Sequence, residues 1–193
     1  MRDRLVTAAI VCIETHGYAG ASVSRIVQQA GVSRGAYLHH FRAKHLIFKA
    51  VALRLVGDVF RRLGDMEPNQ GSTAEDLRVV LHTIWDAVVT GPEGRVFAEL
   101  MLAARTDEVV AQHLRRPAFR ALRLFGWGAQ RRIPIAKTSP LTSSDVVRLA
   151  QWTLRGMALD TALSLDPKFF HRQIDLFVDM LAPHLPSASS NGG

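Results

Sequence analysis

The stretch SVSRIVQQAGVSRGAYLHH, residues 22–40, decides how the rest of the chain is interpreted. In its first half, apolar residues recur at the spacing of one face of a short helix, namely at Val23, Ile26, Val27 and Ala30. Ser22 suits the N-cap of this helix, and Ser33 suits the N-cap of a second one. Gly31 supplies the permissive backbone of a tight turn. Two short helices joined by a short turn that contains Gly form a helix-turn-helix, which is the structure predicted here.

The second of these helices, expected to run from Arg34 to about His40, carries residues that suit the major groove of DNA. Its first turn, Arg34-Gly35-Ala36, combines a guanidinium that can bind guanine edges with residues small enough to admit the backbone. Hydroxyl, imidazole and basic groups nearby can donate to phosphates. The predicted DNA-binding residues are Ser22, Ser24, Arg25, Ser33, Arg34, Gly35, Ala36, Tyr37, His39, His40 and Lys44.

The charge of the chain supports this placement. Residues 1–54 carry eight Lys or Arg side chains against two acidic ones, whereas the remainder carries 16 against 15. An excess of positive charge in one part of a chain is typical of a nucleic-acid-binding domain. Lys44 stands near the start of the next helix, where the helix dipole disfavours a cation. A bound phosphate would explain a lysine at that position.

The remainder of the chain is predicted to be helical. Helical periodicity continues from Phe41, interrupted by turn-rich segments at 64–72 and 133–144, and no strand alternation is present. The last two helices each carry two apolar stripes, although one intramolecular core covers only one of them. A two-fold-related copy could cover the other, and burial within the monomer is the open alternative. The residues predicted to form a dimer interface are Leu149, Trp152, Gly156, Leu159, Leu163, Phe169, Leu176 and Met180.

Several other classes of protein are disfavoured. The longest apolar stretch, residues 5–13, is too short to span a membrane, and no secretory pattern is present, so a cytoplasmic protein is expected. One cysteine, Cys12, excludes an internal disulfide. The eight histidines have neither metal-ligand spacing nor a nucleophile motif beside them. No cofactor, no metal and no enzymatic activity are expected.

The segment AGVSRGAYLHHFRAK, residues 30–44, closely resembles the signature of the tetracycline-repressor (TetR) family. The resemblance extends back through THGYAGASVSRIVQQ and covers roughly residues 2–54. The chain departs from the family at Tyr37-Leu38, where many members have Leu and then a Tyr that contacts a phosphate. Leu38 cannot make that contact, and Tyr37 either takes part in DNA binding or packs in the core.

The resemblance implies an all-α protein with about nine helices. Residues 1–46 would form a three-helix DNA-binding domain, residues 47–185 a larger ligand-binding and dimerisation domain, and residues 186–193 a disordered tail. Helices of the second domain would enclose a ligand cavity. Candidate lining residues, for which ordinary core packing is the alternative, are Trp85, Phe97, Met101, His113, Trp127 and Met157.

The expected function is that of a homodimeric repressor. It would bind a double-stranded, pseudo-palindromic operator and be released by a small, largely apolar ligand. A regulator of the same fold that needs no ligand, or that activates transcription, is the first alternative. An all-helical enzyme is the second, although no catalytic constellation supports it.

Overall fold

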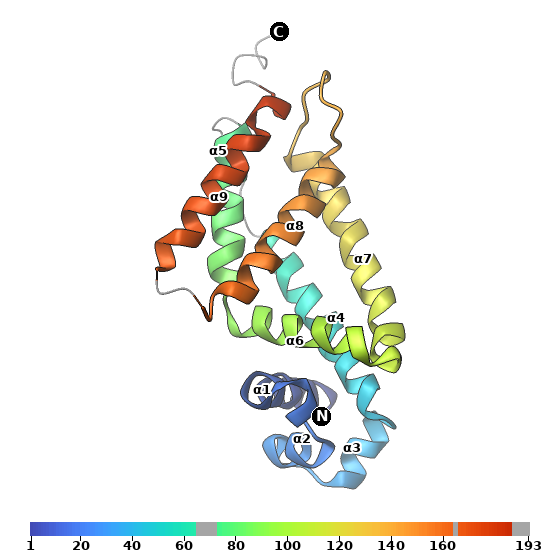
Figure 1. Ribbon diagram of the computed structural model, residues 1–193. Helices are drawn as coiled ribbons and strands as arrows, with labels where there is room; N and C mark the ends of the chain where they lie inside the picture. Colours follow the sequence, from blue (N-terminus) through green and yellow to red (C-terminus); the bar gives the residue numbers. More distant parts are fainter. Residues whose placement is uncertain (65–72, 164–165, 187–193) are drawn as a thin grey trace. The chain divides into compact units, whose positions relative to one another are not determined.

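The computed structural model describes residues 1–64, 73–163 and 166–186 (Figure 1). Within these ranges it contains nine α-helices and no strand, which confirms the predicted all-α fold. The helices are α1 (Arg2–Gly20), α2 (Val23–Ala30), α3 (Arg34–His40), α4 (Lys44–Gly64), α5 (Thr73–Ile84), α6 (Pro92–Thr106), α7 (Glu108–Arg132), α8 (Ser143–Asp160) and α9 (Pro167–Leu181). A π-helical turn, η1 (Trp85–Val89), follows α5, and a 3-10 turn, η2 (Ala182–His184), follows α9. Residues 187–193 of the predicted disordered tail and residues 65–72 of the first turn-rich segment lie outside the described residues.

The chain packs as two units that do not follow the order of the sequence. The first unit consists of residues 1–65 and 91–120, and the second of residues 66–90 and 121–193. The first unit therefore contains α1 to α4 together with α6 and the beginning of α7. The predicted boundary after residue 46 separates a DNA-binding from a ligand-binding domain and does not coincide with the boundary between these two packing units. It stays a prediction.

In the first unit, α1 packs against α2, α4 and α6. Its buried face carries Leu5 and Ile13, which join a single apolar cluster with Ile26 of α2 and Phe48 of α4. The helical conformation of α1 is interrupted at Gly17, whose φ of 67° lies in the left-handed region. Glycine adopts this conformation without a Cβ penalty, which explains why the interruption falls at this residue.

The turn between α2 and α3 has the predicted chemistry. The Ser22 hydroxyl accepts a hydrogen bond from the backbone N–H of Arg25 at 3.2 Å, and the Ser33 hydroxyl accepts one from Ala36 at 3.1 Å. Both serines thus satisfy N–H groups that a helix start leaves without partners. Gly31 ends α2 with φ 59° and ψ 44°, the left-handed conformation typical of a helix C-terminus.

Polar contacts tie the end of α1 to α6 and α7 within the first unit. The backbone N–H of Tyr18 donates to Glu99 at 3.0 Å, and the Tyr18 hydroxyl donates to Asp107 at 3.0 Å. Burial and the hydrogen bond to Asp107 raise the pKa of Tyr18 to about 12. Asp107 also accepts from the N–H groups of Val110 and Val109 at the start of α7, and these bonds, with that from Tyr18, lower its pKa. One carboxylate therefore fixes α1 against the start of α7.

The second unit is built on α5 and α9, with α8 packed against α9 and η1. Trp85 of η1 is buried, and its ring centroid lies 5.2 Å from that of Phe170 of α9. Val146 and Ile174 belong to the same cluster. At the start of α8, Thr142 and Asp145 form a reciprocal capping box.

The conformation of Gly31 gives a stability test with a matched control. Gly31→Ala is expected to destabilise the protein by about 1–2 kcal/mol, because a side chain disfavours the left-handed region. Gly35→Ala is expected to stabilise it by about 0.5–1 kcal/mol, because Gly35 is an ordinary helical position and only the Ser33 hydroxyl lies near the new methyl, at 3.8 Å. Urea denaturation followed by circular dichroism measures both, and equal effects of the two variants would contradict the assignment.

Candidate DNA interface

The helix-turn-helix presents most of the predicted DNA-binding side chains at the surface of the first unit. Exposed residues are Ser22, Ser24, Arg25, Ser33, Arg34, Gly35 and His39. Ala36, His40 and Lys44 are half-buried, and Tyr37 is buried. The outward face of α3 therefore starts at Arg34, the first residue of this helix.

Arg34 is the first residue of α3 and follows the N-cap Ser33. In the part of the chain that the structure describes, its guanidinium forms no ion pair. Gly35 has no side chain and Ala36 has a small one, so base edges in a DNA groove could approach the backbone of α3 here. This arrangement leaves the donors of Arg34 available to a guanine edge or a phosphate.

Two other predicted contact residues are partly engaged within the protein. Arg25 donates from Nη1 to the carbonyl oxygen of Gly20 at 2.7 Å. Lys44 donates from Nζ to the carbonyl oxygen of Tyr18 at 3.5 Å, and its ammonium lies 5.0 and 5.2 Å from the ring centroids of Tyr18 and Phe48. Burial lowers the pKa of Lys44, while Asp107 opposes that shift. Lys44 is thus held against the end of α1, and its phosphate contact stays a prediction.

The predicted phosphate contact of Tyr37 is wrong. Tyr37 is 1% exposed, and its ring packs in the core of the first unit with a centroid 6.0 Å from that of Phe41. Burial raises its pKa, and its hydroxyl has no hydrogen-bond partner among the residues that the structure describes. The alternative that Tyr37 belongs to the core is therefore correct. The physical reason is its position on α3, one turn before Phe41 on the same inward side.

Leu38 takes the outward position instead, and the sequence-based site assignment missed it. Its side chain is 48% exposed and follows Arg34 by four residues, so the two side chains share one face of α3. The signal that could have found it is this spacing, because residues i and i+4 of a helix lie on the same side. The outward face of α3 thus combines a cation with an apolar side chain.

The candidate ligand-lining residues divide between the two units. Phe97, Met101 and His113 are half-buried in the first unit, and His113 packs its ring against that of His45 at 4.1 Å between centroids. Trp85 is a core residue of the second unit, and Met157 is half-buried there. The side chain of Trp127 lies outside what the structure describes. The ligand site stays a prediction.

The residues predicted to form a dimer interface are all exposed. They are Leu149, Trp152, Gly156, Leu159, Leu163, Phe169, Leu176 and Met180, with Trp152 62% and Met180 76% exposed. A Cβ added at Gly156 would meet nothing within 4 Å. A shallow groove beside this face is lined by residues that include Thr153, Met157, Leu176 and Phe177. The opposite stripe, with Ala150, Leu154 and Ile174, fills the core, so the structure resolves which stripe is internal.

Other kinds of site are not found. Across residues 1–64, 73–163 and 166–186, no helix is long and apolar enough to cross a membrane. The same described residues contain no group of three or more His, Cys, Asp or Glu side chains arranged to hold a metal ion. Cys12 is buried in the first unit, and burial raises its pKa.

Comparison with known proteins places the helix-turn-helix in a family. The protein-family model described as "Bacterial regulatory proteins, tetR family" matches residues 5–51. The HTH-type transcriptional repressor AcnR of Corynebacterium efficiens is 43% identical over 51 residues, which make up 26% of this chain and 27% of the repressor. The chain therefore spans about a quarter of the length of this curated relative.

Similarity of fold extends over nearly the whole chain. A transcriptional regulator from Rhodococcus sp. RHA1 has a TM-score of 0.76 and 26% identity, with 95% of this chain and 97% of that chain covered. The transcriptional regulator FadR from Bacillus subtilis, solved in complex with stearoyl-CoA, has a TM-score of 0.70 and 15% identity, with 92% and 97% covered. The matched proteins are transcriptional regulators and not enzymes, which removes the alternative of an all-helical enzyme. Residues 5–51 therefore form a helix-turn-helix domain of the TetR family of bacterial regulatory proteins, and the fold of the whole chain is similar to that of solved transcriptional regulators.

Proposed function

We propose that this chain is a cytoplasmic, homodimeric repressor that binds operator DNA through α3 and is released from it by a small, largely apolar ligand. The observation that carries the proposal is the outward face of α3, where Arg34, Gly35 and Leu38 are exposed on a helix whose start is capped by Ser33. Recognition helices contact bases mainly through their N-terminal residues, which are the residues presented here.

The charge of the first 54 residues supports DNA binding. Eight basic side chains stand against Asp3 and Glu14. Glu14 is engaged by Arg95 of α6 at 2.6 Å, so one of the two acidic groups is neutralised within the first unit. The remaining positive charge would attract phosphates of any sequence and position α3, whereas Arg34 and Leu38 would distinguish bases.

The exposed apolar face of α8 and α9 supports a second copy of the chain as its partner. Large contiguous apolar patches are rare on monomeric proteins and mark interaction surfaces. Two-fold pairing would let each stripe cover its equivalent, and Gly156 would permit close approach of the helices. Such a dimer presents two α3 helices, which suits half-sites about 34 Å apart on a pseudo-palindromic duplex.

Release by a ligand is supported by the fold and by the contacts of α1. FadR from Bacillus subtilis, which shares this fold, was solved with stearoyl-CoA, a ligand with a long apolar chain. In this chain Tyr18 connects α1, which packs against α2 of the helix-turn-helix, to α6 and α7 through Glu99 and Asp107. A ligand that displaces α6 or α7 would thereby alter the placement of α3, and by linkage operator DNA would weaken ligand binding equally. Regulation without ligand, or activation, is the alternative.

Arg34 is expected to carry base discrimination. On a duplex selected from a random pool by the wild-type protein, Arg34→Ala should cost about 1–3 kcal/mol of binding free energy and relax the preference at one base pair. Lys137→Ala, a change of an exposed lysine in the turn before α8, is the control and should bind like the parent. Fluorescence anisotropy at several salt concentrations measures both variants, and a wild-type protein that ignores DNA at low salt refutes the proposed function.

Leu38 is expected to contact a thymine methyl group, because an exposed apolar side chain beside Arg34 would face the base edges. Replacing each operator thymine in turn by deoxyuridine removes one methyl group without changing the hydrogen-bonding pattern. At one position this change should weaken the wild-type protein and leave Leu38→Ala unaffected. Tight binding to every deoxyuridine duplex would show that Leu38 reads no methyl group, even if α3 binds DNA.

The dimer face is tested by adding one charge to it. Leu176→Glu should convert the dimer to a monomer and reduce affinity for a two-half-site operator, because a carboxylate would be buried against its own copy. Val79→Glu changes an exposed valine of α5 outside this face and should leave the dimer intact. Analytical ultracentrifugation gives the result, and a wild-type protein that sediments as a monomer at micromolar concentration excludes the interface.

A further inference from the structure

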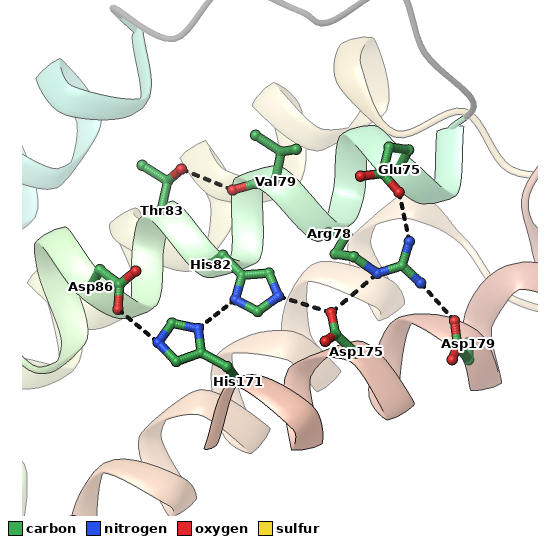
Figure 2. A network of polar contacts seen from close by, with 9 residues as sticks. All are labelled: Glu75, Arg78, Val79, His82, Thr83, Asp86, His171, Asp175 and Asp179. Carbon is green, nitrogen blue, oxygen red and sulfur yellow. Dashed lines mark hydrogen bonds and ion pairs between the residues drawn. The ribbon is translucent and has the colours of Figure 1, made fainter. Parts of the chain in front are cut away.

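A chain of polar contacts joins α5 and η1 to α9 in the second unit (Figure 2). Nδ1 of His82 lies 2.7 Å from Nδ1 of His171, and Nε2 of His82 lies 2.9 Å from Oδ1 of Asp175. At the other end, Nε2 of His171 lies 3.3 Å from Oδ1 of Asp86. Both ring nitrogens of each histidine therefore face another polar atom, and the two rings are the centre of the chain.

The sequence contains a matching pattern on each side. Arg78, His82 and Asp86 follow one another at intervals of four, and so do His171, Asp175 and Asp179. At this spacing the side chains of a helix form one row. The contacts between α5, η1 and α9 bring the two rows together with opposite charges facing.

The two imidazole rings meet edge to edge. Their planes differ by 9° and their centroids are 4.9 Å apart, although the two Nδ1 atoms are separated by only 2.7 Å. The short nitrogen separation lies in the ring planes, as a hydrogen bond between ring nitrogens requires. One Nδ1 must carry a proton, since two lone pairs at this distance would repel each other.

The three contacts need more ring protons than two neutral histidines carry. Three contacts, from Asp175 to His82, from His82 to His171 and from His171 to Asp86, need three ring protons in total. Two neutral imidazoles carry only two, because each has one N–H and one lone pair. With both carboxylates ionised, the complete chain therefore contains one imidazolium. Without the third proton, one contact sets a lone pair against a carboxylate or against another lone pair.

We infer that His82 and His171 form a proton-binding site, and that its third proton latches α9 to the π-helical turn η1. The contact that opens when this proton leaves is the one between His171 and Asp86. It is the longest of the three, and Asp86 is the most exposed member, at 61%. Loss of the proton leaves the Nε2 lone pair of His171 facing a carboxylate, which removes an attraction and creates a repulsion.

The negative charge of Asp175 favours the protonated state of the two histidines, and Arg78 holds the neighbouring carboxylates in place. Asp175 lies beside His82, and the hydrogen bond and charge of His82, with those of Arg78, hold the pKa of Asp175 below its usual range. Arg78 donates to Glu75 at 2.7 Å and to Asp179 at 2.6 Å, so its charge is shared among three carboxylates. On α8, which packs against α9, the charged residues are Asp145, Arg148, Arg155 and Asp160, and none belongs to the chain in Figure 2.

The sign of the pH dependence follows from the proton count. The third proton makes stability fall with rising pH only where the two histidines of the unfolded chain together hold less than one extra proton, which is above the ordinary histidine pKa of about 6.5. The depressed pKa of Asp175 acts in the opposite direction, and only in acid, where its stabilisation is lost as pH falls through the folded pKa. The third proton therefore stabilises the contact between α9 and η1 near neutral pH, and its loss in mildly alkaline solution opens that contact.

Nitrogen-15 NMR of the full chain tests the proton count directly. At about pH 6, His82 and His171 together should show three protonated ring nitrogens, and at about pH 8.5 two. The signals are assigned by their absence in His171→Gln and His82→Gln. The same count at both pH values would overturn the proposal. The measurement needs neither DNA nor a dimer, so its failure is distinct from failure of the proposed function.

Stability gives a second readout. Between about pH 7 and pH 8.5 the unfolding equilibrium constant of the wild-type protein should rise by up to tenfold per pH unit relative to His171→Gln, which is the effect of one proton. Asp86→Asn, which keeps both rings, should move this change to lower pH. His16→Gln alters an exposed histidine of α1 and should reproduce the wild-type slope. Equal slopes for wild type and His171→Gln, or a slope difference that EDTA abolishes, would refute the proton site.

Discussion

The position of α3 depends on the burial of Tyr37. A helix of seven residues is too short to be stable alone, so its orientation comes from packing and from its cap. Tyr37 and Phe41 pack inward in the core of the first unit, while the Ser33 hydroxyl completes the first turn. With these fixed, Arg34 and Leu38 have only the outward face left. The proposed DNA-binding surface is thus a consequence of how α3 is packed.

The first unit connects that surface to helices far along the chain. Leu100 of α6 belongs to the same apolar cluster as Leu5 of α1, and Tyr18 contacts Glu99 and Asp107. Because interiors are close-packed, a displacement of α6 cannot be absorbed without moving its neighbours. The TetR-family helix-turn-helix therefore packs as part of a larger unit, so that displacements of α6 reach it.

The second unit has two different surfaces built on the same helix. One side of α9 meets α5 through the histidine chain and a buried stripe that includes Ile174, and another side exposes Leu176 and Met180. The first side is covered within the unit, whereas the second exposes apolar area to water. Proton binding and the proposed pairing of two copies therefore involve the same element. The π-helical turn η1 supplies both the buried Trp85 and the exposed Asp86.

The sequence by itself determined the all-α fold, the helix-turn-helix and its caps, because Ser22, Gly31 and Ser33 act on backbone groups within a few residues. It also identified two apolar stripes on α8 and α9. Tertiary structure decided that Tyr37 is internal and Leu38 external, that Lys44 lies against Tyr18, and which stripe fills the core. It alone brought His82 and His171, 89 positions apart, within hydrogen-bond distance. Periodicity fixes which residues share a helix face, but the direction of that face depends on packing against distant segments.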